Sequence, residues 1–401
     1  MLWRGELLDA AIERAFRHLD QASDRGLARA IVGAVLRHLV DLDALIDGTT
    51  RQRLPDDARA RLVLRLALAQ ALVLETPAHA AVATALPLVE GGPRRLVHGV
   101  LSALLKMPAQ LADPPSLPET WRQRWGDSMA DAAARALACE PPLDLTLRDP
   151  TQTAHWLAVL GGASLWPGHV RLAGHKGRIE DLPGYAGGAW WVQDLAAQLP
   201  ARLLDPAPGS NVLDLCAAPG GKTLQLAAAG ARVTALDISE KRASRIRDNL
   251  ERTRLTADVV VADAARWTPA AAPDAILLDA PCSATGTFRR HPDVLYARSA
   301  VQIEALTRVQ AMLLHRACDL LRPGGVLVYC VCSLEAEEGE AQLAAFIQHR
   351  DDMTTLPIGI DEVPAGLPVH PRGWLQTGPA DLAGVGGIDG FFMARLWKRP
   401  A

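Results

Sequence analysis

The chain has 401 residues, of which 49% are hydrophobic and 22% charged, so it is long enough for two or three folded domains and too apolar for a disordered protein. A formal net charge of −3 excludes a general electrostatic attraction to nucleic acid, and any such binding must come from local basic patches. No apolar run reaches the roughly 18 residues of a membrane span, and the N-terminal stretch lacks the features of a signal peptide, so we expect a cytoplasmic protein with reduced thiols.

The first quarter of the chain is predicted to be helical. Apolar residues recur every three or four positions in "GLARAIVGAVLRHLVDLDALI" and "ARLVLRLALAQALVL". This spacing predicts an all-helical domain over residues 1–110. Prolines cluster over residues 106–121 and predict a linker, because proline lacks a backbone donor and disfavours helix in the residue before it. We assign residues 111–205 to this linker and a mixed α/β connecting subdomain.

The remaining residues, 206–401, alternate between strand and helix patterns. The strand candidates are "NVLDLCAA", "ARVTALD", "ADVVVAD", "DAILLDA" and "GGVLVYCVC", and helical patterns such as "EKRASRIRDNLERT" lie between them. This alternation predicts a doubly wound parallel α/β sheet, in which the carboxyl ends of the strands meet at one edge and ligands bind there.

A turn that contains two glycines follows the first of these strands. Glycines let the backbone of such a turn approach a ligand closely, although a turn of this kind also occurs without a ligand. The candidate cofactor-binding residues at the turn are Cys216, Ala217, Ala218, Pro219, Gly220, Gly221 and Lys222.

Acidic residues end the next three strands, at Asp237, Asp263 and Asp279. A carboxylate at the end of the second strand is placed to accept hydrogen bonds from ribose hydroxyls. The glycine pattern is neither of the two that bind pyrophosphate or triphosphate. We therefore predict an adenosine-containing ligand without phosphates, and S-adenosyl-L-methionine fits this description because carboxylates also suit its amino and sulfonium groups.

Two of the six cysteines, Cys282 and Cys332, follow the fourth strand and end the fifth, and a serine comes after each. A parallel sheet places both at the same edge. We expect no metal, since a zinc site needs about four ligands at recurring spacing. Two thiols beside a methyl donor suit covalent catalysis on a pyrimidine, because C5 of cytosine becomes nucleophilic once a thiolate has added to C6. A second group must then help to remove the C5 proton, and Asp279 is placed to act as an acid near N3.

The motifs "LDLCAAPGGKT", "DAPCSATGTFRRHPD", "YCVCSLEAEEGE" and "DGFFMARLWK" resemble those of the RNA cytosine-5 methyltransferases. The resemblance implies a Rossmann-like, S-adenosylmethionine-dependent sheet in which Cys332 is the nucleophile and Cys282 assists release. The segments "LARAIVGAVLRHLVDLDALI" and "RRLVHGVLSALL" are similar to the NusB-like, RNA-binding N-terminal domain of members that modify small-subunit ribosomal RNA. This similarity implies that a cytidine of 16S ribosomal RNA is the substrate, and we expect the enzyme to be a monomer.

Four basic residues are candidates for RNA contact, because basic side chains near the reacting cysteines hold phosphates; they are Arg148, Arg289, Arg290 and His291. The alternative is an ordinary solvated loop. Asp149 stands where the family has a neutral amide, and phosphates would repel its carboxylate.

Two alternatives to this function remain open. One is the same chemistry on transfer RNA, or on DNA with Cys282 as the nucleophile. The other is a catalytically inactive assembly factor, in which the helical domain binds RNA and the sheet serves only as a platform.

Overall fold

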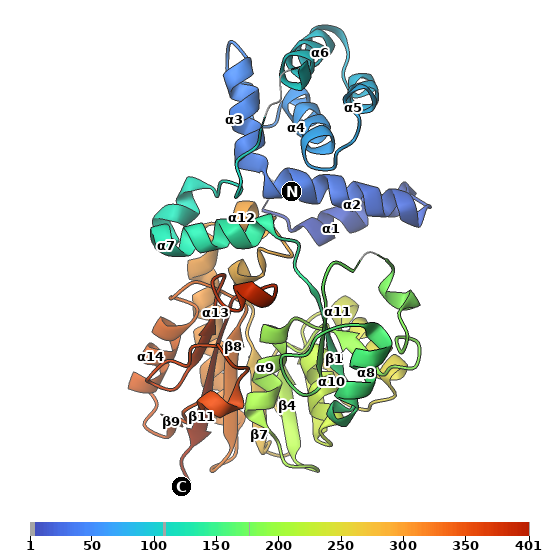
Figure 1. The fold of residues 1–401 in the computed structure, drawn as a ribbon. Coiled ribbons are helices and arrows are strands. Elements are labelled where there is room, and N and C mark those ends of the chain that lie inside the picture. The colour runs from blue at the N-terminus through green and yellow to red at the C-terminus, as the bar shows by residue number, and fades with distance from the viewer. Residues whose placement is uncertain (1–4, 107–109, 176, 401) are drawn as a thin grey trace. The chain divides into compact units, whose positions relative to one another are not determined.

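The computed structural model describes residues 5–106, 110–175 and 177–400, and the chain forms two compact units (Figure 1). The helical unit contains the residues up to Cys139 together with Phe288–Arg298, and the sheet unit contains Glu140–Thr287 and the residues from Ser299 onward. The units meet after residues 139, 287 and 298, whereas the predicted domain boundaries lie at residues 110 and 205. Residues 107–109 of the predicted linker lie outside the described residues.

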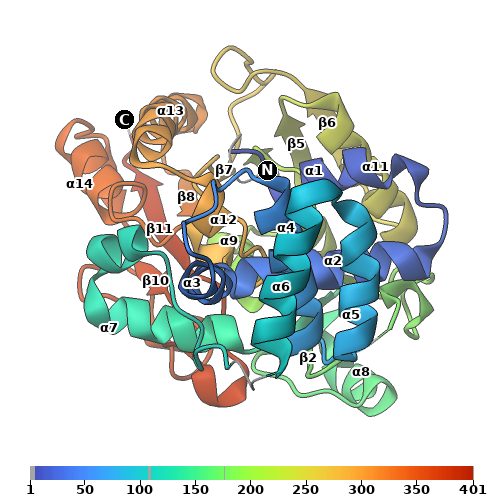
Figure 2. The same ribbon diagram turned by 90° about the horizontal axis from the view of Figure 1, so that it is seen from above.

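The helical unit is built from the amphipathic segments that the apolar spacing predicted. Its helices are α1 (Leu8–Ala15), α2 (Ala22–Arg37), α3 (Leu39–Thr49), α4 (Arg59–Leu72), α5 (Ala78–Ala85), α6 (Gly91–Lys106), α7 (Glu119–Ala138) and the short α12 (Val294–Ala297). Figure 2 shows α4, α5 and α6 side by side, and residues such as Leu64, Leu68 and Leu101 are fully buried among them. In the part of the chain that the structure describes, none of the helices is long and apolar enough to span a membrane.

The segment Phe288–Arg298 belongs to the helical unit, although it comes from the second half of the chain. The indole of Trp121 donates to the carbonyl of Leu295 (Nε1···O 2.6 Å), and the amide of Leu8 donates to the carboxylate of Asp293 (N···Oδ2 2.7 Å). The prediction assigned this segment to the catalytic domain of residues 206–401. These hydrogen bonds explain why it belongs to the helical unit instead, and sequence patterns do not reveal them.

The sheet unit contains the predicted strands and helices. Its larger sheet has eight strands within the described residues, in the order β10-β11-β8-β7-β4-β5-β6, with β9 paired to β11. The strands are β4 (Asn211–Leu215), β5 (Arg232–Asp237), β6 (Asp258–Val261), β7 (Ala275–Asp279), β8 (Val326–Val331), β9 (Met353–Thr355), β10 (Leu375–Thr377) and β11 (Phe391–Lys398).

The five strands from β4 to β8 are parallel, as predicted, but the sheet as a whole is mixed. Strand β11 pairs with β8 in the antiparallel direction, and β9 and β10 pair with β11 in the same manner. The prediction of parallel strands covered only those that alternate with helices. The antiparallel strands lie from Met353 onward, where no long helix connects one strand to the next.

Helices cover both faces of the larger sheet. Helices α9 (Leu195–Leu204), α10 (Gly221–Ala228) and α11 (Glu240–Thr253) pack on one face, and α13 (Ala300–Leu320) and α14 (Glu340–Gln348) pack on the other. Because successive residues of a strand point to opposite faces, Val212 packs toward Leu199 of α9 while Leu213 packs toward Leu314 of α13. This burial on both faces explains the nearly continuous apolar runs of the central strands.

A smaller sheet precedes the larger one in the chain. Its strands are β1 (Leu143–Leu147), β2 (His169–Leu172) and β3 (Trp190–Val192), in the order β2-β1-β3, with α8 (Thr153–Leu160) between the first two. Asp144 of β1 is buried and accepts two hydrogen bonds of 2.7 Å from the guanidinium of Arg171, and a third of 3.1 Å from the amide of Leu195 at the start of α9. A single carboxylate therefore joins the small sheet to the helix that precedes β4.

The surroundings of Asp144 determine its ionisation. Burial raises the pKa of this carboxyl, but the hydrogen bonds and charges of Arg171 and the nearby His169 outweigh burial, and the net result is a pKa well below the ordinary value. An aspartate whose pKa is lowered by folding stabilises the fold above about pH 4, and this contribution is lost as the pH falls through and below that value.

Replacement of Asp144 by asparagine should destabilise the sheet unit, because it leaves the Arg171 guanidinium buried without its counter-charge. We expect the unfolding free energy to fall by about 3–5 kcal/mol at pH 7. Urea titration followed by near-ultraviolet circular dichroism measures it, and Asp181→Asn, at an exposed position of the same unit, is the matched control. Two results would contradict the role given to this carboxylate. One is an Asp144→Asn variant as stable as the parent protein at pH 7, and the other is an equal loss of unfolding free energy for both proteins on acidification to pH 3.

Candidate functional site

The carboxyl ends of the parallel strands bring the predicted residues to one edge of the sheet. The register pairs Leu215 of β4 with Leu236 of β5 and with Leu278 of β7, and it pairs Asp279 of β7 with Cys330 of β8. The glycine turn, the strand-end acids and the two cysteine motifs therefore begin at the same level, as the prediction of parallel strands requires.

Gly220 occupies a backbone conformation that explains the residue type at this turn. Its φ is 104°, and it is the N-cap of α10. A Cβ atom at this position would lie 3.2 Å from Cγ2 of Ile246 in α11. A larger residue would be strained in φ and crowded by the neighbouring helix, so glycine keeps the turn against the sheet.

Two of the three strand-end acids organise the backbone around them. The carboxylate of Asp237 is 1% exposed and accepts hydrogen bonds from the amides of Ala218 (3.2 Å) and Ser239 (3.0 Å). Asp263 accepts from the amide of Ala265 (3.0 Å), and its side chain is 44% exposed. Each carboxylate oxygen has two lone pairs, so both acids retain acceptor capacity for a ligand.

A cavity of about 460 Å³ lies at this edge, and we call it the cysteine-lined cavity. Its lining includes the predicted residues Cys216, Ala218, Pro219, Asp237, Asp263, Asp279, Cys282 and Cys332, together with apolar side chains such as Leu236 and Met312. Burial, followed by the charges of Asp279 and Asp237, raises the pKa of the Cys216 thiol to about 12, so this cysteine is a neutral wall of the cavity.

A second cavity of about 420 Å³, the tryptophan-lined cavity, shares Pro219 and Asp279 with the first. It is lined by Tyr185, Trp191, Gln193, Asn249, Arg252 and the predicted residues Ala217, Pro219, Gly221, Lys222 and Asp279. Of the seven turn residues predicted to bind a cofactor, Ala217, Gly221 and Lys222 line this second cavity rather than the first, and Gly220 lines neither.

Lys222 and Asp279 form an ion pair at the boundary of the two cavities. The ammonium lies 2.7 Å from the Asp279 carboxylate and 5.1 Å from the centre of the Phe391 ring. Burial lowers the pKa of Lys222, but the charge and hydrogen bond of Asp279 together with the charges of Cys330 and Cys332 outweigh it, and the net pKa is raised, so the ammonium stays protonated. The site thus carries a fixed positive charge beside Asp279.

The two cysteines that the sequence singled out are in contact. Their sulfur atoms are 3.4 Å apart, and neither cysteine forms a disulfide. The hydrogen bond with Cys332, then burial, then the charges of Cys332 and Glu338 raise the pKa of the Cys282 thiol well above its ordinary value. Cys282 therefore keeps its proton, and either sulfur can be the donor in the contact.

The predicted RNA-contact residues are distributed between the two units. Arg148 lies in the sheet unit, where its guanidinium donates to the carbonyl of Thr253 (3.0 Å). Arg289, Arg290 and His291 belong to the helical unit. Arg289 is only 2% exposed, so its side chain is not presented to solvent. Its backbone carbonyl accepts from the guanidinium of Arg37 (2.6 Å). His291 is exposed and Arg290 is half-buried.

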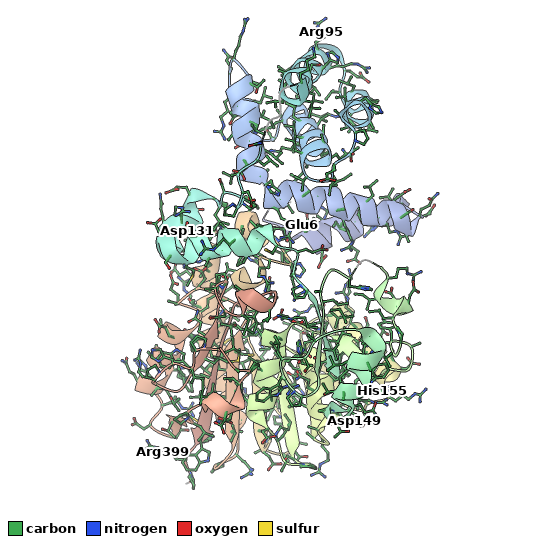
Figure 3. The ribbon with its side chains drawn as sticks, in the orientation of Figure 1. Glu6, Arg95, Asp131, Asp149, His155 and Arg399 are labelled. Carbon is green, nitrogen blue, oxygen red and sulfur yellow. The ribbon has the colours of Figure 1, made fainter. Side chains whose placement is uncertain are left out.

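Asp149 has a structural role that the sequence comparison with the family motif did not suggest. Its carboxylate accepts from the amide (3.0 Å) and the hydroxyl (2.6 Å) of Thr151, and it caps the short helix that leads into α8. In Figure 3, Asp149 lies near His155, which belongs to α8. These bonds lower the pKa of the Asp149 carboxyl.

Sequence reasoning missed Glu338, a fully buried residue whose carboxylate contacts the serines that follow both cysteines. The available signal was the Cys-Ser pair repeated in both motifs together with the paired glutamates after the second. In the described residues, no group of three or more histidine, cysteine, aspartate or glutamate side chains could hold a metal ion.

Comparison with known proteins gives two family matches. Residues 201–397 match the family described as 16S rRNA methyltransferase RsmB/F, and residues 3–106 match the NusB family. The two matches cover most of the predicted domains of residues 1–110 and 206–401.

Individual relatives match over nearly the whole chain. The chain is 35% identical to ribosomal RNA small subunit methyltransferase B of Klebsiella pneumoniae, over 94% of this chain and 90% of that protein. It is 36% identical to the protein of the same name from Xanthomonas campestris, over 98% and 94% of the two chains.

A solved methyltransferase homologue from Pyrococcus horikoshii is 26% identical, with a TM-score of 0.58 over 70% of this chain and 93% of that one. The fold is thus a NusB-like helical domain followed in the chain by a Rossmann-like methyltransferase sheet. From its sequence, its sheet and these matches, the chain belongs to the RsmB/F family of 16S ribosomal RNA methyltransferases.

Proposed function

We propose that the protein methylates C5 of a cytidine in 16S ribosomal RNA, with S-adenosyl-L-methionine as the methyl donor and a covalent bond between Cys332 and C6 of the base as the intermediate. The observation that carries this proposal is the pair of sulfur atoms 3.4 Å apart at the wall of the cysteine-lined cavity. A structural role would not need two thiols in contact at a ligand-binding edge.

The cysteine-lined cavity fits the proposed methyl donor. Its volume of about 460 Å³ lies within the usual range for small-molecule sites, and its apolar lining suits an adenine ring. Asp237 and Asp263 would accept hydrogen bonds from the ribose and the base, and the acidic edge suits the positively charged amino and sulfonium groups. When bound, the donor supplies an electrophilic methyl group.

Cys332 is the proposed nucleophile. Its sulfur lies 3.4 Å from that of Cys282. As a thiolate it would form a bond to C6, and the electrons of the C5–C6 double bond would move into the ring, which makes C5 nucleophilic. Asp279 lines both cavities. With a proton taken up from solvent, its carboxyl group would donate a hydrogen bond to N3 and so stabilise the negative charge that develops on the ring, and the Lys222 ammonium lies 2.7 Å from the same carboxyl group.

Cys282 is the proposed group for release. After C5 has formed its bond to the methyl group, the C5 proton must leave and the bond between C6 and Cys332 must break, so that the double bond re-forms. Cys282 contacts the nucleophile directly. Once its thiol has passed its proton to solvent, the raised pKa makes the thiolate a strong base that takes the C5 proton, and the electrons of the broken C6–S bond return to Cys332 as its thiolate.

The target cytidine must be unpaired or turned out of its helix, because the thiol and the methyl donor approach the ring from its faces. Arg148, Arg290 and His291 remain proposed phosphate contacts, and Arg289 is left out because its side chain is buried. The 16S substrate is supported by the names of the relatives, and the NusB-like domain is the proposed RNA-binding module.

The purified protein should transfer the methyl group of labelled S-adenosylmethionine to one cytidine of an unmodified 16S transcript. Cys332→Ala should lower the rate by roughly 10³-fold or more, because the C5 carbon is not activated, while donor binding is unchanged. Mapping of 5-methylcytidine by mass spectrometry measures both. Label on transfer RNA alone would exclude the ribosomal substrate, and no label on either RNA would favour the non-catalytic alternative.

Cys282→Ala should still form the covalent RNA adduct but release it slowly. We expect a protein–RNA band that resists denaturing electrophoresis and is absent from Cys332→Ala. Cys139→Ala, a change at an exposed cysteine far from the site in sequence, should behave as the parent protein. An adduct that disappears in Cys282→Ala and persists in Cys332→Ala would reverse the two roles.

Asp237→Asn should weaken the binding of S-adenosylmethionine at least tenfold, since a hydrogen bond to a charged group contributes about 1.5–3 kcal/mol. Isothermal titration calorimetry without RNA measures this affinity. Asp258→Asn is the control, because Asp258 is exposed and begins β6 at the opposite end of the strand. Equal affinities for the two variants would show that Asp237 does not hold the donor.

A further inference from the structure

The two cysteine loops are tied together one residue beyond each sulfur. Ser283 follows Cys282 after β7, and Ser333 follows Cys332 after β8. Both serines are fully buried, and both contact Glu338, which lies just before α14 and is itself 0% exposed. The hydroxyls of the two serines are also 3.1 Å apart.

The Glu338 carboxylate accepts from four donors. Oε1 accepts from the amide of Ser283 and from Nε2 of Gln310, both at 2.9 Å, and Oε2 accepts from the hydroxyls of Ser283 and Ser333, both at 2.5 Å. A buried carboxylate is costly unless its lone pairs are used, and here each oxygen has two donors. Such a group is over-determined by its surroundings and has little freedom to move.

Glu338 is also held from behind. Its carbonyl accepts from the hydroxyl of Tyr329 in β8 (2.6 Å), and its amide donates to the carbonyl of Glu335 (3.1 Å). Gln310, from α13, bonds the Glu338 carboxylate and also donates to the carbonyl of Pro281 (2.9 Å), the residue before Cys282. Glu338 is therefore bonded to the sheet through Tyr329 and to α13 through Gln310, in addition to its bonds with the two loops.

We infer that Glu338 is a positioning residue that sets the spacing of Cys282 and Cys332. The inference rests on the proposed function, in which both thiols act on one base. An apolar side chain would fill the same space, but it would leave the Ser283 amide without its acceptor, the two hydroxyls with only each other and Thr285 as partners, and the loops without the carboxylate that they share. A displacement of about 1 Å between reacting groups is enough to lower a rate roughly 10²-fold.

The spacing is measured without RNA, by the equilibrium between the parent dithiol and glutathione disulfide. One glutathione disulfide oxidises Cys282 and Cys332 to an intramolecular disulfide and yields two glutathione thiols, and peptide mapping identifies that pair among the six cysteines. Glu338→Ala should lower the resulting effective concentration of the two thiols at least tenfold. Glu337→Gln, at the exposed neighbouring glutamate, should leave it unchanged.

Rescue by the conservative variant separates positioning from packing. In Glu338→Gln the amide oxygen can still accept from the Ser283 amide and Gln310, and the amide nitrogen can donate to the serine hydroxyls, which rotate freely. This variant should keep the effective concentration within about threefold of the parent value. Ser333→Ala removes only the contact between the Cys332 loop and Glu338 and leaves three donors on that carboxylate, so it should give an intermediate value. This variant serves if Glu338→Ala does not fold.

Methylation kinetics complete the test. In Glu338→Ala, kcat should fall roughly 10²-fold while KM for RNA and the affinity for S-adenosylmethionine stay within about twofold of the parent values. A folded Glu338→Ala or Ser333→Ala protein with the parent effective concentration would overturn the inference. A parent protein that shows the thiol effect but no methylation would instead overturn the proposed function alone.

Discussion

The parallel pairing of β7 with β8 is the constraint on which the site depends. Asp279 stands opposite Cys330 in the register, so the two chain segments that leave these strands start from the same edge. Cys282 and Cys332 are 50 positions apart in sequence, and their sulfur atoms are nonetheless 3.4 Å apart. The chain passes from β7 through α13 to β8, and such a crossover returns the chain to the same edge of the sheet. The contact between the two sulfur atoms is therefore a consequence of topology.

Buried charges complete what the topology begins. Asp144 joins the small sheet to α9, the Lys222–Asp279 pair separates the two cavities, and Glu338 joins the two cysteine loops. A buried ion pair or carboxylate is weak evidence for stability in itself, because desolvation offsets much of its attraction. Such a group instead fixes geometry, because a charge that is bonded to several donors has one low-energy arrangement. Asp144, the Lys222–Asp279 pair and Glu338 each lie where two segments of the chain must keep a set spacing.

Close backbone contact has the same effect at another point of the site. The amide of Gly390 donates to the carbonyl of Gly286 (2.8 Å), and a Cβ on Gly286 would lie 1.9 Å from the Gly390 carbonyl oxygen. The loop that carries Cys282 is thereby held against the segment that enters β11. This contact gives a physical reason for glycine in both the "SATGTF" and the "DGFF" motifs, since any larger residue would push the loop away from the sheet.

The sequence by itself determined the helical first domain, the parallel strands β4 to β8, the acids at their ends and the convergence of the two cysteines. Each of these follows from local periodicity and from the geometry of parallel strands, which need no knowledge of distant contacts. Only the tertiary structure decided three other features. The antiparallel strands β9 to β11 extend one side of the sheet, and Phe288–Arg298 belongs to the helical unit. Lys222 pairs with Asp279 and lines the second cavity. It also decided the role of Glu338. These outcomes depend on hydrogen bonds between residues far apart in the chain, and such bonds leave no periodic trace in the sequence.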